Sequence, residues 1–131
     1  MSIETSSDVV GVIILESLSD ESVMHGMTIL QESDIQAPPD DPYPVWSRRL
    51  VRIPAREMEA FAVRLATSMK EGFYNHFVDE MRILVVVLKG GWFLLDKREK
   101  SRWGEMVQYA ATVGVGSRWT MNIPVDEDEL L

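Results

Sequence analysis

The 131-residue sequence contains no cysteine. Disulfide bonds, thiolate metal ligands and a cysteine nucleophile are therefore excluded, and a reducing, cytoplasmic location is favoured. Long apolar runs are also missing near the start. The run Val9–Leu15 spans only seven residues, and the segment before it contains no lysine or arginine. This pattern is typical of neither a signal peptide nor a membrane span. A chain of this length predicts one domain, and we expect it at residues 1–131.

Basic residues are absent from positions 1–45, although the whole chain carries 13 of them against 21 acidic residues. Residues 1–45 have a net charge of −9, residues 46–125 have +5, and residues 126–129 have −4. One interpretation is a set of ordinary surface charges, in which each ion pair contributes less than about 1 kcal/mol. The other is an acidic segment that covers a basic surface and competes with an anion. The acidic balance disfavours nucleic acid as a partner.

Apolar runs predict the strands. Val9–Leu15 and Met81–Leu88 are continuous and rich in β-branched residues, which favours strands buried on both faces. Further strands are expected at Met27–Ile35, Trp46–Ile53, Phe73–Phe77 and Trp92–Asp96, with an edge strand at Trp119–Pro124. The short connections at 78–80 and 89–91 predict that three of these strands form an antiparallel meander.

Two helices are predicted from apolar spacing. Between Ala55 and Met69, apolar residues recur at helical intervals along one stripe, and a second stripe runs from about Ser101 to Val113. A shorter helical turn is expected between Ser19 and Gly26. Residues 36–44 contain four of the six prolines and predict a linker, because proline disrupts both helices and central strands.

The order of these elements is β-α-β, proline-rich linker, β-α-β-β-β-α. It predicts an α+β fold, with a mostly antiparallel sheet, two main helices on one face and a ferredoxin-like second half. Within the single domain we expect an acidic N-terminal segment at 1–45, a core at 46–124 and an acidic tail at 125–131.

Several short motifs resemble a family of small uncharacterised prokaryotic proteins with no assigned activity. They are Gly11-Val12 followed by Glu16-Ser17-Leu18, then Phe73-Tyr74 with Phe77, Trp92-Phe93, and Tyr109-Ala110 with Gly114. The resemblance covers most of residues 9–124. It implies a single α+β domain and transfers no catalytic residue.

The strongest local group of functional side chains surrounds His76. On a strand, Tyr74 and His76 share a face, and a three-residue loop at 78–80 would place His76 opposite Arg82. Asp79 would lie near enough to raise the basicity of the histidine. His76 and Asp79 are therefore candidate catalytic residues, and Tyr74 and Arg82 candidate ligand contacts. The alternative is a packed tyrosine beside a surface histidine.

A second candidate lies on the expected strand Trp46–Ile53, where Arg48 and Arg52 share a face with Trp46 and Leu50. Two cations beside an aromatic ring suit a phosphate or another small anion. The alternative is an open sheet face on which arginine stems cover apolar surface. No metal site or cofactor is expected, because the two histidines lack ligand spacing and no phosphate-binding or dinucleotide-binding motif is present.

These features lead to two hypotheses about function. The first is a non-enzymatic interaction module that forms a homo-oligomer and binds a small anionic ligand. The second is a small enzyme that acts on an anionic or phosphorylated metabolite, with His76 as acid or base and an arginine clamp.

Overall fold

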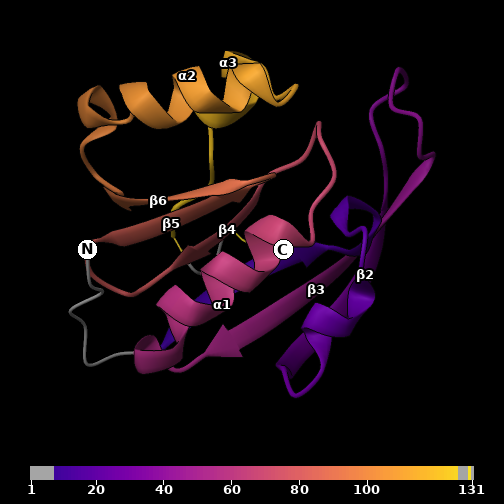
Figure 1. Ribbon diagram of the computed structural model, residues 1–131, viewed down its shortest axis with the longest axis horizontal. Coiled ribbons are helices and arrows are strands. Elements are labelled where there is room, and N and C mark those ends of the chain that lie inside the picture. The colour runs from indigo at the N-terminus through magenta and orange to yellow at the C-terminus, as the bar shows by residue number, and fades with distance from the viewer. Residues whose placement is uncertain (1–7, 127–129, 131) are drawn as a thin grey trace.

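A computed structural model describes residues 8–126 and 130 of the chain. Six strands form one sheet in the order β2-β3-β1-β4-β5-β6, and all neighbouring strands are antiparallel (Figure 1). Their bounds are β1 Val9–Ile14, β2 Thr28–Gln36, β3 Val45–Ile53, β4 Asn75–Val78, β5 Ile83–Leu88 and β6 Gly91–Asp96. The predicted α+β class with a mostly antiparallel sheet is confirmed. Most of the predicted acidic tail lies outside the described residues.

Three α-helices accompany the sheet: α1 Ala55–Thr67, α2 Gly104–Thr112 and α3 Ser117–Thr120. Short 3-10 turns occupy Leu15–Ser17, Glu21–Met24 and Lys100–Arg102. No helix in the described part of the chain has the length and apolar character needed to cross a membrane.

The edge strand predicted at 119–124 is wrong, because α3 occupies the start of this segment. The backbone N–H of Trp119 donates to the carbonyl of Gly116 at 3.0 Å, and that of Met121 donates to Ser117 at 2.9 Å. These local helical bonds satisfy the backbone groups that a strand would have offered to a neighbour.

The two main helices cover opposite faces of the sheet. On β5, Val85 and Val87 belong to the cluster around α1, whereas Leu84 and Val86 belong to the cluster around α2. Figure 1 shows α2 on one side of β5 and β6 and α1 on the other. The prediction that both helices share one face, and with it the ferredoxin-like second half, is therefore wrong. The physical reason is the fully apolar β5, which can be buried on both sides only if each face is covered.

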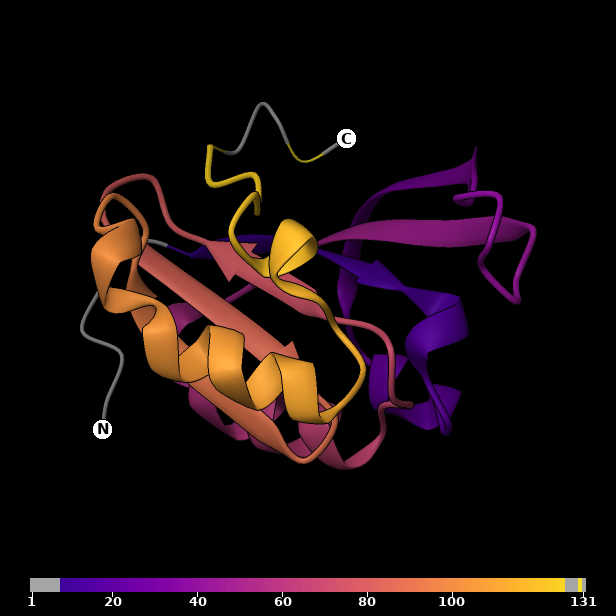
Figure 2. The same ribbon diagram turned by 90° about the horizontal axis from the view of Figure 1, so that it is seen from above.

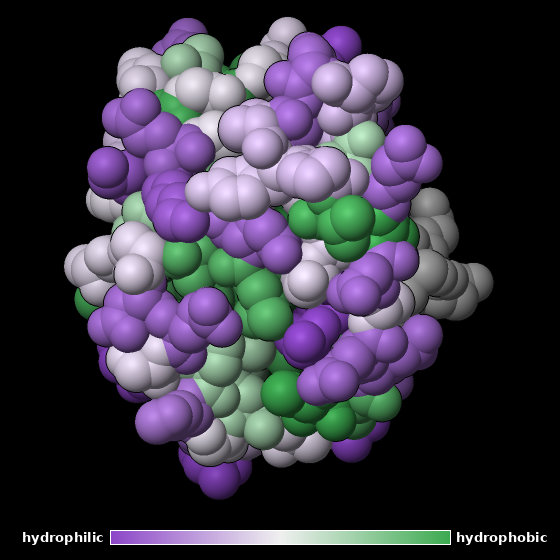
Figure 3. Space-filling model, turned by 90° about the vertical axis from the view of Figure 1, so that its right-hand side faces the viewer, coloured by the Kyte–Doolittle hydropathy of each residue, from purple (hydrophilic) through white to green (hydrophobic). Residues whose placement is uncertain are grey.

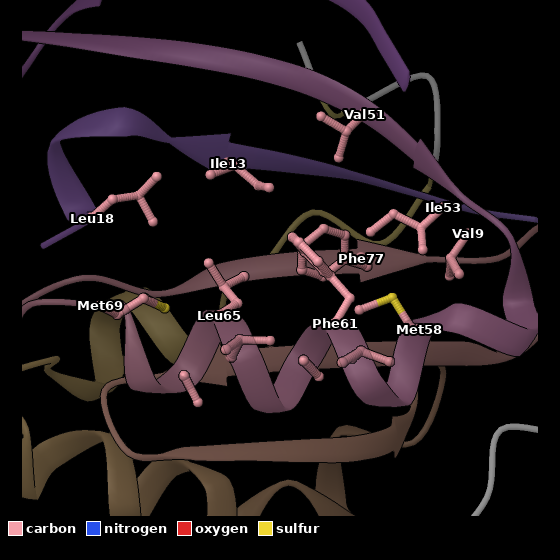
Figure 4. Packing of buried hydrophobic residues seen from close by; sticks show 14 of the residues in the cluster. Val9, Ile13, Leu18, Val51, Ile53, Met58, Phe61, Leu65, Met69 and Phe77 are labelled. Carbon is pink, nitrogen blue, oxygen red and sulfur yellow. The ribbon is translucent and has the colours of Figure 1, made fainter. Parts of the chain in front are cut away.

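Helix α1 packs its apolar stripe against β1, β3 and β4. Figure 4 shows Met58, Phe61 and Leu65 directed from the helix toward the strands. Phe61 and Phe77 meet edge to face, with ring centroids 5.9 Å apart. Burial of each such side chain contributes about 1.5–3 kcal/mol, so this stripe anchors the helix.

The acidic N-terminal segment is an integral part of the sheet. β1 lies between β3 and β4, and β2 forms a hairpin with β3. The proline-rich segment predicted as a linker is therefore the loop of this hairpin, with the N–H of Ala37 donating to the carbonyl of Pro44 at 3.1 Å. Figure 2 shows that this hairpin extends to one side, beyond the region of the sheet that α2 covers.

Glycine is required at position 11, where β1 pairs with β4. It pairs with Phe77, and a Cβ atom at this position would overlap both the Phe77 ring and the carbonyl oxygen of His76. We expect Gly11→Ala to lower the free energy of unfolding by about 2 kcal/mol or more, because a packed strand must move. Urea denaturation measures this loss.

Gly104→Ala provides the matched control. Apart from its chain neighbours and the backbone of its own helix, no atom of the described residues lies within 4 Å of a Cβ built on Gly104, which begins α2. Alanine favours helices over glycine, so this variant should be as stable as the wild type or slightly more so. Equal losses in the two variants would contradict the close packing of β1 against Phe77.

Candidate functional site

A cavity of about 400 Å³ lies on the sheet face that carries α2. Strands β1, β3 and β4 provide Val12, Arg48 and His76 to its lining. Residues 38 and 40–42 of the β2–β3 loop contribute another side, and residues 114–115 before α3, with residues 118–119 of α3, contribute a third. The volume suits a small organic molecule.

The strand register places Arg48 and His76 on either side of β1. His76 pairs with Val12, and Arg48 pairs with Ile14. Two strand spacings and a two-residue offset put their Cα atoms about 12 Å apart. The long arginine side chain can span much of this distance, so both residues can reach one ligand.

Three residues that line the cavity each carry a buried side-chain nitrogen without a hydrogen-bond partner among the described residues: Trp46 Nε1, Arg48 Nε and His76 Nε2. A buried polar group without a partner costs about 1–3 kcal/mol relative to a satisfied one. Native proteins contain few such groups. Three such groups belong to residues around one cavity, which makes this cavity the candidate functional site.

Burial lowers the pKa of His76 to about 4, while its hydrogen bond to the backbone of Pro124 acts in the opposite direction. Only 7% of His76 is exposed. The imidazole is therefore neutral at physiological pH. The expected increase in basicity from Asp79 is wrong, because burial dominates the environment of His76.

Tyr74 lies beside His76, with ring centroids 5.8 Å apart. Burial raises the pKa of its phenol to about 12, so the hydroxyl keeps its proton at neutral pH. Both rings line the cavity. Together with Trp46 they give it an aromatic lining that suits a planar apolar ligand body.

The loops around the cavity carry charges of both signs. Asp40 and Asp41 come from the β2–β3 loop, and Asp41 accepts a hydrogen bond from the N–H of Tyr43 at 2.9 Å. Arg118 comes from the start of α3, with its guanidinium 5.0 Å from the ring centroid of Trp119. The exposed Asp40 and Arg118 can interact with solvent, unlike the buried Nε of Arg48.

Asp79 has a structural role away from the cavity. Its Oδ1 atom accepts hydrogen bonds from the backbone N–H groups of Met81, Arg82 and Ile83 at 2.7–3.0 Å. The buried Lys97 donates from Nζ to the Asp79 carbonyl oxygen at 2.6 Å. These bonds close the turn between β4 and β5.

This turn changes the register expected for the hairpin. His76 pairs with Val86, so the predicted pairing with Arg82 is wrong. The turn is longer than the three residues assumed, because the Asp79 carboxylate accepts hydrogen bonds from the backbone of residues 81–83. Arg82 is consequently exposed in the turn.

The structure thus brings Tyr74, His76 and Arg48 together and leaves Asp79, Arg82 and Arg52 outside the cavity lining. Arg52 is on the face predicted for it, but it pairs with Val10 and Thr28 near the far end of the sheet and is exposed. Sequence reasoning did not identify the segments 38–42 and 114–119 as neighbours. Neither segment carries a periodic pattern that could have linked them.

Comparison with protein-family models, with curated proteins and with solved structures found no match. The resemblance to a family of small uncharacterised proteins therefore remains a prediction. Among residues 8–126 and 130, no group of three or more His, Asp or Glu side chains is arranged to hold a metal ion.

The lowered pKa of His76 predicts a loss of stability in mild acid. Between pH about 6.5 and about 4, the unfolded chain takes up a proton at His76 that the folded chain does not. This group should therefore reduce the free energy of unfolding by about 3 kcal/mol as the pH falls through that window. Urea denaturation at several pH values measures the change.

His76→Phe is the control for this experiment, because it removes the titrating group while leaving the carboxylates. Between pH 6.5 and 4 the wild type should lose more stability than the variant. Below pH 4 the two proteins should lose equal amounts of stability. NMR titration of the His76 ring gives an independent check. A midpoint near 6.5 would contradict the proposed effect of burial.

Proposed function

We propose that the protein is a binding module for a small organic anion, which occupies the cavity beside Arg48. The observation that carries this proposal is Arg48, a cavity-lining residue whose buried Nε atom has no partner among the described residues. A guanidinium donates hydrogen bonds and cannot accept them, so its complement is an acceptor, best a negatively charged one.

Trp46 supports the same choice. Trp46 also lines the cavity, and its buried indole N–H has no partner among the described residues. An indole nitrogen is a donor only. Two unused donors on neighbouring positions of one face of β3 suit the oxygen atoms of a carboxylate or phosphate. The aspartates of the loop lie on a different element, and Asp41 already bonds to the backbone.

Binding is favoured over catalysis by the state of His76. An efficient acid or base has a pKa near the working pH, whereas the pKa of His76 is lowered to about 4. Asp79, the proposed partner, is engaged in the β4–β5 turn. We therefore retain the enzyme hypothesis only as the alternative.

The binding proposal can be tested with benzoate, inorganic phosphate and benzamide. Benzamide has nearly the shape of benzoate but no charge. We expect an anion to raise the melting temperature, because a ligand that binds only the folded state stabilises it in proportion to ln(1 + [L]/Kd). Calorimetric titration then gives the Kd. The absence of binding by either anion, or equal binding of benzamide and benzoate, would reject the proposal.

Arg48→Met and Arg52→Met form a matched pair for the same titration. Both remove one positive charge from the same face of β3, but only Arg48 lines the cavity. A lost hydrogen bond to a charged group costs about 1.5–3 kcal/mol. We therefore expect Arg48→Met to raise the Kd by about ten-fold or more, and Arg52→Met to leave it nearly unchanged.

Self-association through the outer edge of the sheet is a second property that we propose. β2 has a neighbour on one side only, and Ile29 and Leu30 on this strand are 43% and 41% exposed. Figure 3 views this side of the molecule and shows hydrophobic side chains across its middle, between hydrophilic ones. Exposed strand edges with apolar side chains favour pairing with another chain.

Light scattering at several protein concentrations measures this association. We expect the mean mass to rise with concentration in the wild type and to stay at the monomer value in Leu30→Lys, because lysine protects a strand edge. Val63→Lys is the control, since Val63 is 52% exposed but lies on α1. A monomeric wild type at all concentrations would exclude the homo-oligomer.

A further inference from the structure

We infer that the β2 edge of one copy pairs with the β6 edge of a second copy, so that each contact joins two different surfaces. This inference rests on the self-association proposed above and specifies its partner. β2 and β6 are the two outer strands of the sheet (Figure 1). Pairing between them continues one sheet from copy to copy.

The outer edge of β6 offers free backbone groups. The N–H of Lys97 donates to the carbonyl of Arg82 at 2.7 Å, which makes 82 and 97 a hydrogen-bonded pair of the β5–β6 ladder. Because such pairs alternate along an antiparallel ladder, Trp92 and Leu94 direct their N–H and C=O groups away from β5. Among the described residues, the backbone of residues 91–95 forms hydrogen bonds with β5 alone.

This open stretch ends at Asp96. The carbonyl oxygen of Asp96 accepts hydrogen bonds from Trp103 Nε1 at 2.9 Å and from the backbone N–H of Glu99 at 3.2 Å. Lysine, proline or a bulge commonly protects an edge strand from another chain. Residues 91–95 contain neither lysine nor proline, and their register with β5 is regular. They can therefore accept a further strand.

Charge favours β6 over a second β2 as this partner. Full antiparallel overlap of two β2 strands would set Thr28 opposite Gln36, and Glu32 opposite Glu32 of the second copy. Like charges directly opposite each other destabilise a sheet. A shifted register that separates these carboxylates leaves fewer paired residues. Residues 91–95 of β6 carry no charge, so they can lie beside Glu32 and Asp34 without this repulsion.

The irregularity of β2 favours the same choice. The pairing of β2 with β3 shifts between Ile29 and Gln31, which makes Leu30 an extra residue in the strand. Such bulges disrupt a hydrogen-bond ladder locally. A contact between two β2 strands would contain two bulges, whereas a contact between β2 and the regular β6 contains one. The mixed pair therefore retains more of its hydrogen bonds.

A contact of this kind does not end with two copies. β2 and β6 lie at opposite ends of the sheet, so each dimer keeps one free edge of each type. Such contacts between unlike surfaces form rings or open chains, whereas contact between two β2 edges stops at a dimer. Sedimentation of the wild type should therefore reveal species larger than a dimer of 14.9-kDa chains.

An equal mixture of Leu30→Lys and Leu94→Pro tests the pairing. Leu30→Lys disables β2 and keeps β6, while Leu94→Pro removes an outward N–H of β6 and keeps β2. By light scattering, each variant alone should remain near the monomer mass of 14.9 kDa. The mixture should reach about twice that mass and grow no further, because the two variants share only one intact pair of edges.

Leu94→Ala is the matched control, because it also removes the leucine side chain but keeps the N–H. This variant should associate nearly as the wild type does. Circular dichroism of each variant checks that the sheet is intact. The sedimentation experiment needs no variant and tests the inference even if Leu94→Pro does not fold.

The outcomes separate the inference from the proposed self-association. If the wild type stops at a dimer, or if Leu94→Pro associates as the wild type does, the role of β6 is wrong and association through β2 stands. A mixture that stays monomeric while the wild type associates also overturns the pairing of β2 with β6. If the wild type is monomeric at every concentration, the inference fails together with the proposed self-association.

Discussion

The central position of β1 is the constraint on which the fold and the candidate site depend. β1 is hydrogen bonded to β3 on one side and to β4 on the other, so these two strands run parallel with β1 between them. Helix α1 makes the connection across one face, and the opposite face is left for α2 and the cavity. Gly11 permits the close approach to Phe77 that this arrangement needs.

The end of β1 is held by a buried polar cluster. The Asn75 Oδ1 atom accepts from the N–H of Ile14 at 2.9 Å, and its amide nitrogen donates to Ser17 Oγ at 2.9 Å. The Ser17 hydroxyl in turn donates to the Ile14 carbonyl oxygen at 2.6 Å. Because these bonds join β1 to the start of β4 away from water, they fix the register that pairs Val12 with His76 on one side of β1 and Ile14 with Arg48 on the other.

Much of the fold could be predicted from local patterns. The stripe beginning at Met58 predicted α1 to within two residues at its end, since amphipathic periodicity is a strong signal. The apolar run of β5 was recognised as buried on both faces, yet its consequence for α2 was missed. The strand predicted at 119–124 failed because an apolar segment of this length can also form a short helix over a core.

The site was harder to predict because its geometry depends on pairings that are distant in the sequence. Alternation correctly placed Tyr74 with His76 and Arg48 with Trp46, since a strand fixes which side chains share a face. It could not show that β1 would bring these two groups together. The register of the β4–β5 hairpin failed for a different reason, because the Asp79 carboxylate reorganises the turn.

The proline-rich loop between β2 and β3 has a further consequence for recognition. Four prolines in residues 36–44 restrict its backbone before any ligand arrives, and Pro38 and Pro42 form part of the cavity lining. Under the binding proposal, the loop would not have to lose much chain entropy when a ligand enters. The selectivity of such a site should depend on fit to an existing shape more than on closure around the occupant.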